Sequence, residues 1–124
     1  MAGLLERIAA GEILISDGAW GTFLQAKGLQ PGECPEAWNV THPDDVRSVA
    51  AAYAAVGCDI VETDSFGGTS YKLREFGLAD QVAAYNIAAA KLSKEAIGDA
   101  GYVAASVGPT GQIVEDEGGE VTEE

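Results

Sequence analysis

The segment CDIVETDSFGG, residues 58–68, joins a short apolar run to a polar loop that contains two glycines. Residues 58–63 have the length and the β-branched content of a buried strand. Three polar side chains, Glu62, Asp64 and Ser65, gather at the carboxyl end of that run. Parallel α/β folds bind their ligands beyond the carboxyl ends of strands. The segment therefore predicts both a fold class and the place of a site.

Two further apolar runs repeat this arrangement. Residues 12–16 lead into Asp17 and Gly18, and residues 102–107 contain Ser106. Both runs read as short strands, and residues 12–16 are expected to be buried. The three predicted strands begin about 45 residues apart, which is the spacing of βα units with parallel strands. We therefore predict an α/β fold.

Helices are predicted between these strands. Apolar residues at helical spacing indicate a short helix over residues 3–10, one that begins near Asp44, is capped by Thr41 and ends at Gly57, and a longer one over about 80–97. Residues 22–43 contain glycines and prolines at close intervals and are expected to be irregular.

Charge and composition exclude several classes of partner. The net charge is -13 with seven Lys and Arg, which opposes binding to nucleic acid or to anionic lipid. No apolar run approaches the roughly 20 residues of a membrane span. The two cysteines, Cys34 and Cys58, form no CxxC pair, so we expect no disulfide framework and a cytoplasmic setting.

The polar residues at the three strand ends are predicted to meet at one mouth: Asp17, Gly18, Glu62, Asp64, Ser65 and Ser106. The alternative for each residue alone is that it caps a helix or a loop. Asp17 followed by glycines suits an ammonium ligand that the backbone approaches closely, although an Asp-Gly turn is the commoner meaning of that dipeptide.

Several motifs together resemble a known family. These motifs are ILISDGAWGT (13–22), CPE (34–36), NVTHP (39–43), ETDSFGG (62–68) and SVGPTG (106–111). In this order they resemble the homocysteine-binding domain of the homocysteine S-methyltransferases, in particular the cobalamin-dependent methionine synthases. The resemblance implies a TIM-type (β/α)8 barrel, of which residues 1–124 would form the N-terminal portion, about three βα units.

The resemblance also implies an activity. In this family a zinc ion held by three cysteines binds the sulfur of homocysteine, and the thiolate accepts a methyl group to give methionine. In the cobalamin-dependent branch methylcobalamin is the donor, so homocysteine and the cobalamin and folate domains of a full-length enzyme are the expected partners. In a related branch the donor is betaine, a small onium compound.

The resemblance also implies roles for individual residues of the predicted site. Asp17 and Gly18 match the family's substrate contacts after the first strand, with Asp17 expected to face the amino group of homocysteine. Ser65 and Phe66 match contacts after the second strand. The chain departs from the family at Trp20, where Met is usual, and at Asp64, where Asn is usual, which makes the mouth bulkier and more anionic.

The zinc ligands are expected to be missing. The family's zinc cysteines lie on late strands, and the three predicted strands precede them, so Cys34 and Cys58 are not those ligands. We therefore expect a chain truncated before the zinc-binding strands and inactive by itself. Two alternatives stay open: a noncatalytic partial barrel that binds an amino acid or completes itself with another chain, and a betaine-type or other thiol S-methyltransferase.

Overall fold

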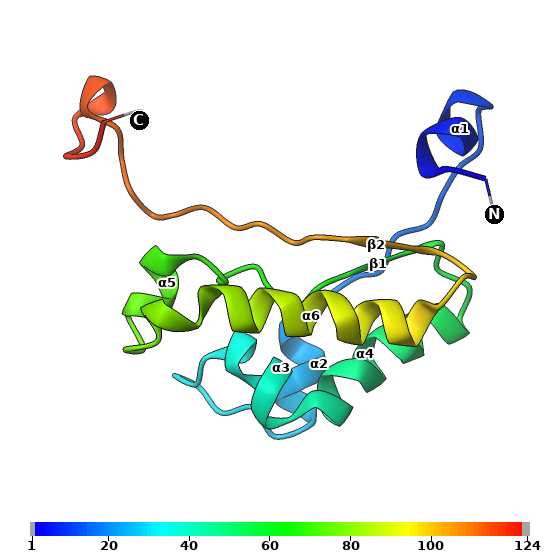
Figure 1. Cartoon of the computed structure of the whole chain (residues 1–124), viewed down its shortest axis with the longest axis horizontal. Helices are drawn as coiled ribbons and strands as arrows, with labels where there is room; N and C mark the ends of the chain where they lie inside the picture. Colours follow the sequence, from blue (N-terminus) through cyan, green and yellow to red (C-terminus); the bar gives the residue numbers. More distant parts are fainter. Residues whose placement is uncertain (1, 123–124) are drawn as a thin grey trace.

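The computed structural model describes residues 2–122 and contains a small parallel sheet with helices packed on one face (Figure 1). Strand β1 (Ile60–Glu62) pairs with β2 (Tyr102–Ala104), with Val61 opposite Val103. Both strands are shorter than the predicted runs at residues 58–63 and 102–107. The prediction of a mixed α/β fold with parallel strands is confirmed for these two strands.

The first predicted strand is the main correction. Residues 12–16 form no ladder, and only Ser16 bridges to Ile60. Ile13 and Ile15 are 88% and 55% exposed, so the expected burial is wrong. The segment is instead tied to β1 by backbone contacts, because the Ile15 carbonyl accepts from the amides of Asp59 and Ile60. An apolar run is buried only where a second layer covers it, and no described element covers this one.

The described helices are α1 (Leu4–Ala9), α2 (Gly21–Ala26), α3 (Trp38–Thr41), α4 (Pro43–Ala55), α5 (Ser70–Arg74) and α6 (Val82–Ile97), with 3-10 turns η1 (Pro35–Ala37), η2 (Ala79–Gln81) and η3 (Glu115–Glu117). The predicted helices at 3–10, 44–56 and about 80–97 are confirmed as α1, α4 and α6 within a few residues. None of these helices has the length and apolar character of a membrane span.

Residues 22–43 are more regular than expected, because α2, η1 and α3 occupy much of this stretch. Thr41 belongs to α3 and does not cap α4; its hydroxyl donates to the Ala37 carbonyl. Helix α4 begins instead at Pro43, whose fixed φ suits the first helical position. The prolines at 35 and 43 thus start elements, where the sequence suggested only breaks.

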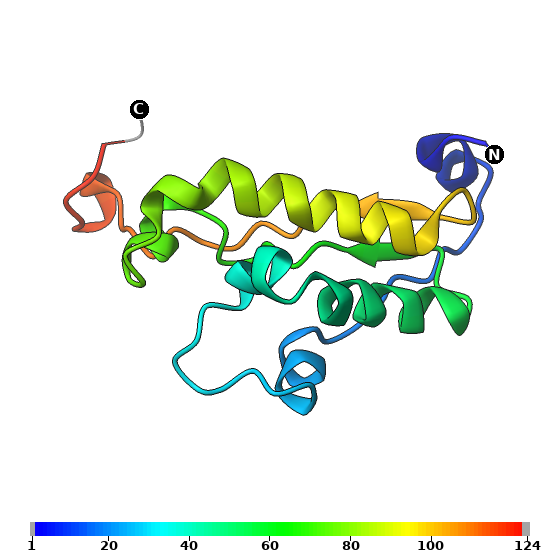
Figure 2. The ribbon, with the colours of Figure 1, turned by 60° about the horizontal axis from the view of Figure 1, so that its bottom comes forward.

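The core lies between the sheet and the helices. Figure 1 shows α4 and α6 below the strands, and Figure 2 shows the two helices running side by side in front of them. Val61 is fully buried and packs with Ala50 of α4 and Ile97 of α6. A second cluster joins α2, α3, α4 and α6 and contains Leu24, Leu29, Trp38, Val46, Val49 and Leu92. This packing positions β1 and the loop that follows it.

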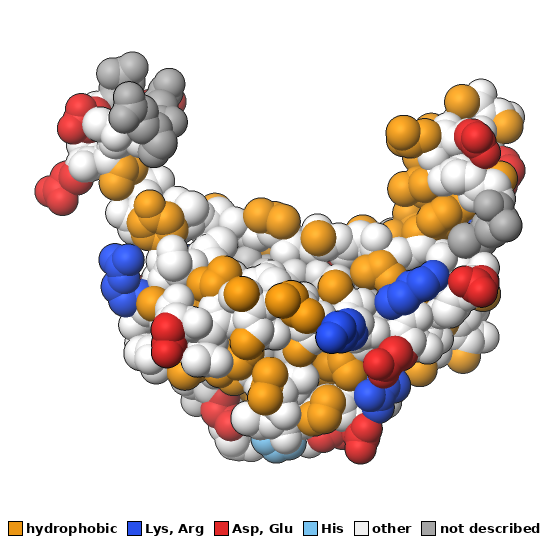
Figure 3. All heavy atoms as spheres, in the orientation of Figure 1, with side chains coloured by type: hydrophobic (Ala, Val, Ile, Leu, Met, Phe, Trp, Pro, Cys, Tyr) orange, Lys and Arg blue, Asp and Glu red, His pale blue; other side chains and the backbone are white. Residues whose placement is uncertain are grey.

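Among the residues that the structure describes, the opposite face of the sheet is covered only at its amino end. There the Tyr102 hydroxyl donates to the Ala2 carbonyl, and Arg7 of α1 donates to Asp59 at 3.1 Å. Figure 1 shows both terminal segments leaving the body on this side, and Figure 3 shows apolar side chains along the concave edge between them. Val107, three residues past β2, is 78% exposed.

We predict that the 124-residue chain self-associates through this uncovered face and the open edge of β2, since an unpaired strand edge is a template for pairing. Val107→Lys should raise the dissociation constant about tenfold, because burying a Val side chain contributes about 1.5 kcal/mol or more. Analytical ultracentrifugation measures this. Val56→Lys is the matched control, since Val56 is 79% exposed but lies at the end of α4. A monodisperse monomeric wild type would contradict the prediction.

Candidate functional site

A cavity of about 390 Å3 opens at the carboxyl end of β1, between the loop after that strand, the segment before α2 and the turn η1. Six of the seven predicted site residues line it: Gly18, Glu62, Asp64, Ser65, Phe66 and Ser106. The remaining lining residues are Ala19, Trp20, Gly21, Leu24, Pro35, Glu36 and Thr63. The structure thus brings together residues from four separate stretches of the sequence, at 18–24, 35–36, 62–66 and 106.

Asp17, the seventh predicted residue, is not among the residues that line the cavity, but it bonds to two of them. Its Oδ2 accepts a hydrogen bond from the backbone amide of Glu62 at 2.8 Å and another from the indole Nε1 of Trp20 at 2.9 Å. Both donors belong to residues that line the cavity. The carboxylate therefore ties the end of β1 to the segment before α2 and orients Trp20. Its expected contact with a substrate ammonium group stays a prediction.

A hydroxyl network joins the loops that follow the two strands. Ser65 Oγ donates to the Ser106 carbonyl at 2.8 Å, and the Ser106 amide donates to Thr63 Oγ1 at 3.1 Å. Thr63 Oγ1 and Ser65 Oγ also form a hydrogen bond. Ser65 and Ser106 therefore lie at one edge of the sheet, as parallel pairing requires. Because these bonds already use the Ser65 hydroxyl, a ligand would have to share it.

Glu36 is a buried cavity residue that sequence reasoning missed. Its side chain comes from η1, is only 5% exposed, and accepts from the Gly67 amide at 2.6 Å and from Cys34 Sγ at 3.4 Å. A Cβ at Gly67 would lie 2.8 Å from Glu36 Oε1, so position 67 needs glycine for this contact. An acid in a three-residue turn carries no periodic signal that would predict its burial.

Asp64 is the second buried acid of the cavity, with 6% of its surface exposed. Asn39 Nδ2 donates to the backbone carbonyls of Asp64 and Glu36, at 2.7 and 2.9 Å, and so joins the two acids. Within the described residues, Asp64 Oδ2 has no hydrogen-bond partner. Burial, and then the charge of Glu36, raise the pKa of Asp64 to about 8. At pH 7 this carboxyl group is therefore mostly protonated.

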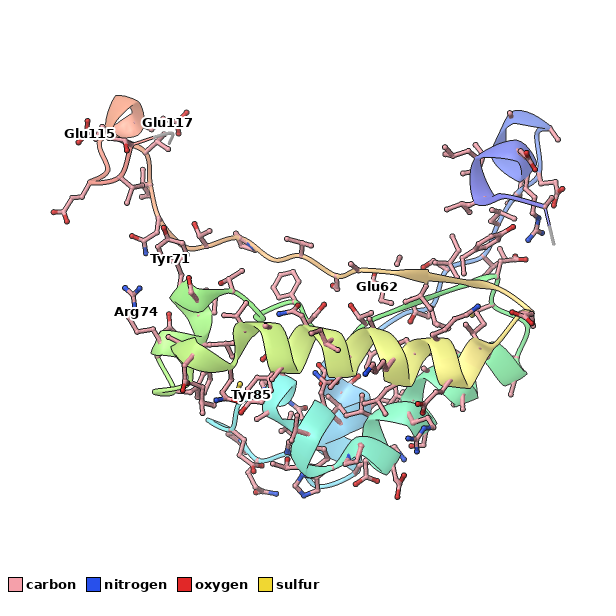
Figure 4. The ribbon with its side chains drawn as sticks, in the orientation of Figure 1. Glu62, Tyr71, Arg74, Tyr85, Glu115 and Glu117 are labelled. Carbon is pink, nitrogen blue, oxygen red and sulfur yellow. The ribbon has the colours of Figure 1, made fainter. Side chains whose placement is uncertain are left out.

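Of the side chains labelled in Figure 4, Glu62 belongs to the cavity lining, and the others lie apart from it. Glu62 sits at the end of β1, whereas Tyr71 and Arg74 lie on α5, where the guanidinium is 5.8 Å from the ring centroid. Tyr85 of α6 packs instead with Cys34 and Leu73. The polar and charged groups of the site therefore come from β1, the loop after it, the segment after β2, η1 and the segment before α2.

The described residues do not fit a zinc site. No group of three His, Cys, Asp or Glu within residues 2–122 is placed to hold a metal ion. Burial raises the pKa of the Cys34 thiol to about 11, which opposes the thiolate that zinc requires. Cys58 lies 3.8 Å from the Ser16 carbonyl, and His42 stacks on Trp38. We therefore assign no metal chemistry to these residues.

Comparison with known proteins gives a consistent result. The family model for homocysteine S-methyltransferase matches residues 14–124. Methionine synthase from Mycobacterium tuberculosis (strain ATCC 25618 / H37Rv) is 28% identical over 82% of this chain and 10% of its own length. S-methylmethionine–homocysteine S-methyltransferase BHMT2 from Mus musculus is 31% identical over 83% of this chain and 27% of its own.

A solved structure matches the fold as well. The oxidised form of the homocysteine methyltransferase MmuM from Escherichia coli superposes with a TM-score of 0.72 and 27% identity, over 89% of this chain and 42% of that chain. Its metallated form gives a TM-score of 0.69 at the same identity. The chain spans less than half the length of each of these relatives.

We predict that Asp64 makes the stability of the fold depend on pH. Its pKa is raised to about 8 from the model-peptide value of 3.8, so between pH 4 and 8 the unfolded chain loses this proton while the folded chain keeps it. The free energy of unfolding should therefore fall as pH rises through this window, by up to about 1.4 kcal/mol per pH unit. Asp64→Asn removes the titrating group and should flatten the profile.

Urea denaturation at pH 5, 6, 7 and 8 measures this effect. The stability of Asp64→Asn relative to wild type should increase with pH, whereas Asp99→Asn, which removes a fully exposed acid, should follow the wild-type profile. Parallel profiles for wild type and Asp64→Asn would show that Asp64 titrates normally.

Proposed function

The chain belongs to the homocysteine S-methyltransferase family, and we propose that it binds the methyl acceptor, homocysteine, in the cavity at the carboxyl end of β1. The observation that carries this proposal is the lining of that cavity, which contains ten residues from the family-like motifs at 13–22, 62–68 and 106–111. In parallel α/β folds this edge of the sheet is where ligands bind.

We propose that residues 1–124 supply part of a (β/α)8 barrel. The parallel pair β1 and β2, with α6 between them in the sequence, is consistent with one βα repeat of such a barrel. The match to 42% of the MmuM chain supports the same reading, since a partial barrel would align with only part of a complete one. In this arrangement the uncovered face of the sheet would point into the barrel.

The proposed roles follow the position of each side chain. Asp17 supplies negative charge near the amino group of the ligand while it holds Trp20 and the end of β1. Gly18, Ser65 and Phe66 hold the amino-acid end of the ligand, and Ser106, which is bonded to Ser65, completes this part of the cavity lining. The described residues include no set of metal ligands, so we assign them to substrate binding. We assign none of them to activation of the substrate thiol.

Methylcobalamin is our proposed methyl donor, delivered by the cobalamin domain of a methionine synthase and recharged through a folate domain. The motifs that resemble methionine synthase and the match to the M. tuberculosis protein support this choice. A small onium donor is the alternative, because Trp20, Phe66 and the half-buried Glu62 line the cavity, and aromatic faces with a carboxylate suit an onium cation. A cytoplasmic location stays a prediction.

A noncatalytic amino-acid-binding module is the second candidate function. The observation that favours it is the lack of a metal ligand set within residues 2–122. Such a module would bind homocysteine without methylating it.

We predict that Asp17→Asn weakens homocysteine binding to the chain about ten- to a hundredfold. A hydrogen bond to a charged group contributes about 1.5 to 3 kcal/mol, and the amide keeps the shape of the carboxylate while it loses the charge. Isothermal titration calorimetry measures the dissociation constant. Asp99→Asn makes the same charge change away from the cavity and should bind like wild type. Equal affinities for all three proteins would remove Asp17 from the site.

We also predict that the purified 124-residue chain retains no stoichiometric zinc and forms no methionine from homocysteine with methylcobalamin, betaine or S-methylmethionine. Tight zinc sites need three or four placed ligands. Metal analysis after treatment with a mild chelator and a labelled-methyl assay provide the test. Stoichiometric zinc or labelled methionine would reject the noncatalytic candidate for the chain as it stands.

A further inference from the structure

The lining of the cavity carries an unbalanced negative charge. Glu36, Glu62 and Asp64 contribute three carboxyl groups, and the described residues that line the cavity include no Lys, Arg or His. A partly enclosed space surrounded by one sign of charge concentrates ligands of the opposite sign. The electrostatics of the cavity therefore favour a cationic group.

Of the three acids, Asp64 is the one with an unmet hydrogen bond. Glu36 is already bonded to the Gly67 amide and to Cys34, and Glu62 is half-buried with access to solvent. Asp64 lines the cavity, and only 6% of its surface is exposed. Its Oδ2 atom has no hydrogen-bond partner among the described residues. A buried polar atom in this state costs about 1 to 3 kcal/mol unless a ligand or water pairs with it.

We propose that the Asp64 carboxyl group takes the primary ammonium group of the ligand and releases its own proton to solvent as it does so. The proposal rests on the function proposed above, in which the ligand is an amino acid. Among the described residues no hydrogen bond reaches either oxygen of the Asp64 carboxyl group, so an ammonium N–H would supply a donor that this group lacks, and its positive charge would face the buried acids. A quaternary ammonium group has no N–H and cannot make this hydrogen bond, so a primary ammonium group fits better.

The charges around Asp64 explain the release of a proton. Glu36 faces it from η1; Cys34 is bonded to Glu36, and Asp17 is bonded to the Glu62 amide at the end of β1. These three groups are two acids and a thiol, and the pKa of Asp64 is raised to about 8 in the free chain, first by burial and then by the charge of Glu36. A bound ammonium group reverses this balance because an opposite charge favours the ionised carboxylate. The ligand keeps its charge, Asp64 ionises, and one proton leaves.

Calorimetric titration of the wild-type chain at pH 7, in phosphate and in Tris, counts the protons released. The two buffers have different ionisation enthalpies, so the difference between the two titrations separates the heat of proton transfer from the heat of binding. The probes are L-homocysteine and L-methionine, which has the same ammonium group and no ionisable thiol. We expect both to release close to one proton. Release with homocysteine but not with methionine would assign the proton to the ligand thiol and overturn the proposal.

Asp64→Asn is the decisive variant, and Asp99→Asn is its control. Asp64→Asn should release no proton and bind methionine at least tenfold more weakly, whereas Asp99→Asn should behave like wild type. Tetramethylammonium should cause no release from any of the three proteins. Binding with unchanged proton release in Asp64→Asn would overturn the proposal and leave the proposed function intact. A lack of binding of either amino acid to wild type would overturn both.

A measurement on wild type alone covers the case in which Asp64→Asn does not fold. If Asp64 must ionise, the affinity for methionine should rise about tenfold from pH 6 to pH 7 and level off above pH 8. An affinity that is constant over this range, or that falls, would overturn the proposal.

Discussion

Parallel pairing of β1 and β2 is the constraint on which the site depends. Two parallel strands end at the same edge of the sheet, so the loops that begin at Thr63 and Ala105 must leave side by side. The hydroxyl network of Thr63, Ser65 and Ser106 then closes the gap between them. The pairing itself is maintained by Val61, which α4 and α6 cover from below. The core thus determines where the polar groups meet.

Periodic segments were predictable from sequence, and segments without a period were not. The apolar stripes of α4 and α6 repeat over three or more turns, so their position and buried face follow from the residues alone. Residues 12–16 have the apolar content of a buried strand, yet burial depends on a covering layer that composition cannot reveal. The short elements α2, η1 and α3 lie among glycines and prolines, where local patterns predict turns and where tertiary packing decides the outcome.

The site shows the same division. Polar residues at strand ends were expected to converge, and Gly18, Asp64, Ser65 and Ser106 line one cavity. The burial of Glu36 was not expected, because it depends on how η1 folds back against the loop after β1. The pKa of Asp64 is raised first by its burial and then by the charge of Glu36, so part of this shift also depends on that contact. Glu36 and Asp64 lie 28 residues apart in the sequence and come together only in the folded chain. Their effect on each other therefore cannot be predicted from a local sequence pattern.

Gly67 connects backbone shape to acid–base behaviour. A Cβ at position 67 would lie 2.8 Å from Glu36 Oε1, which accepts from the Gly67 amide at 2.6 Å, so a side chain there would push the carboxylate aside. A displaced Glu36 would weaken the part of the Asp64 pKa shift that its charge supplies, whereas the larger part, from burial, would stay. A steric change at Gly67, which has no ionisable group, would therefore change the pKa of Asp64. In an evolving lineage, positions 36, 64 and 67 would be free to change only as a set, so the three are expected to covary.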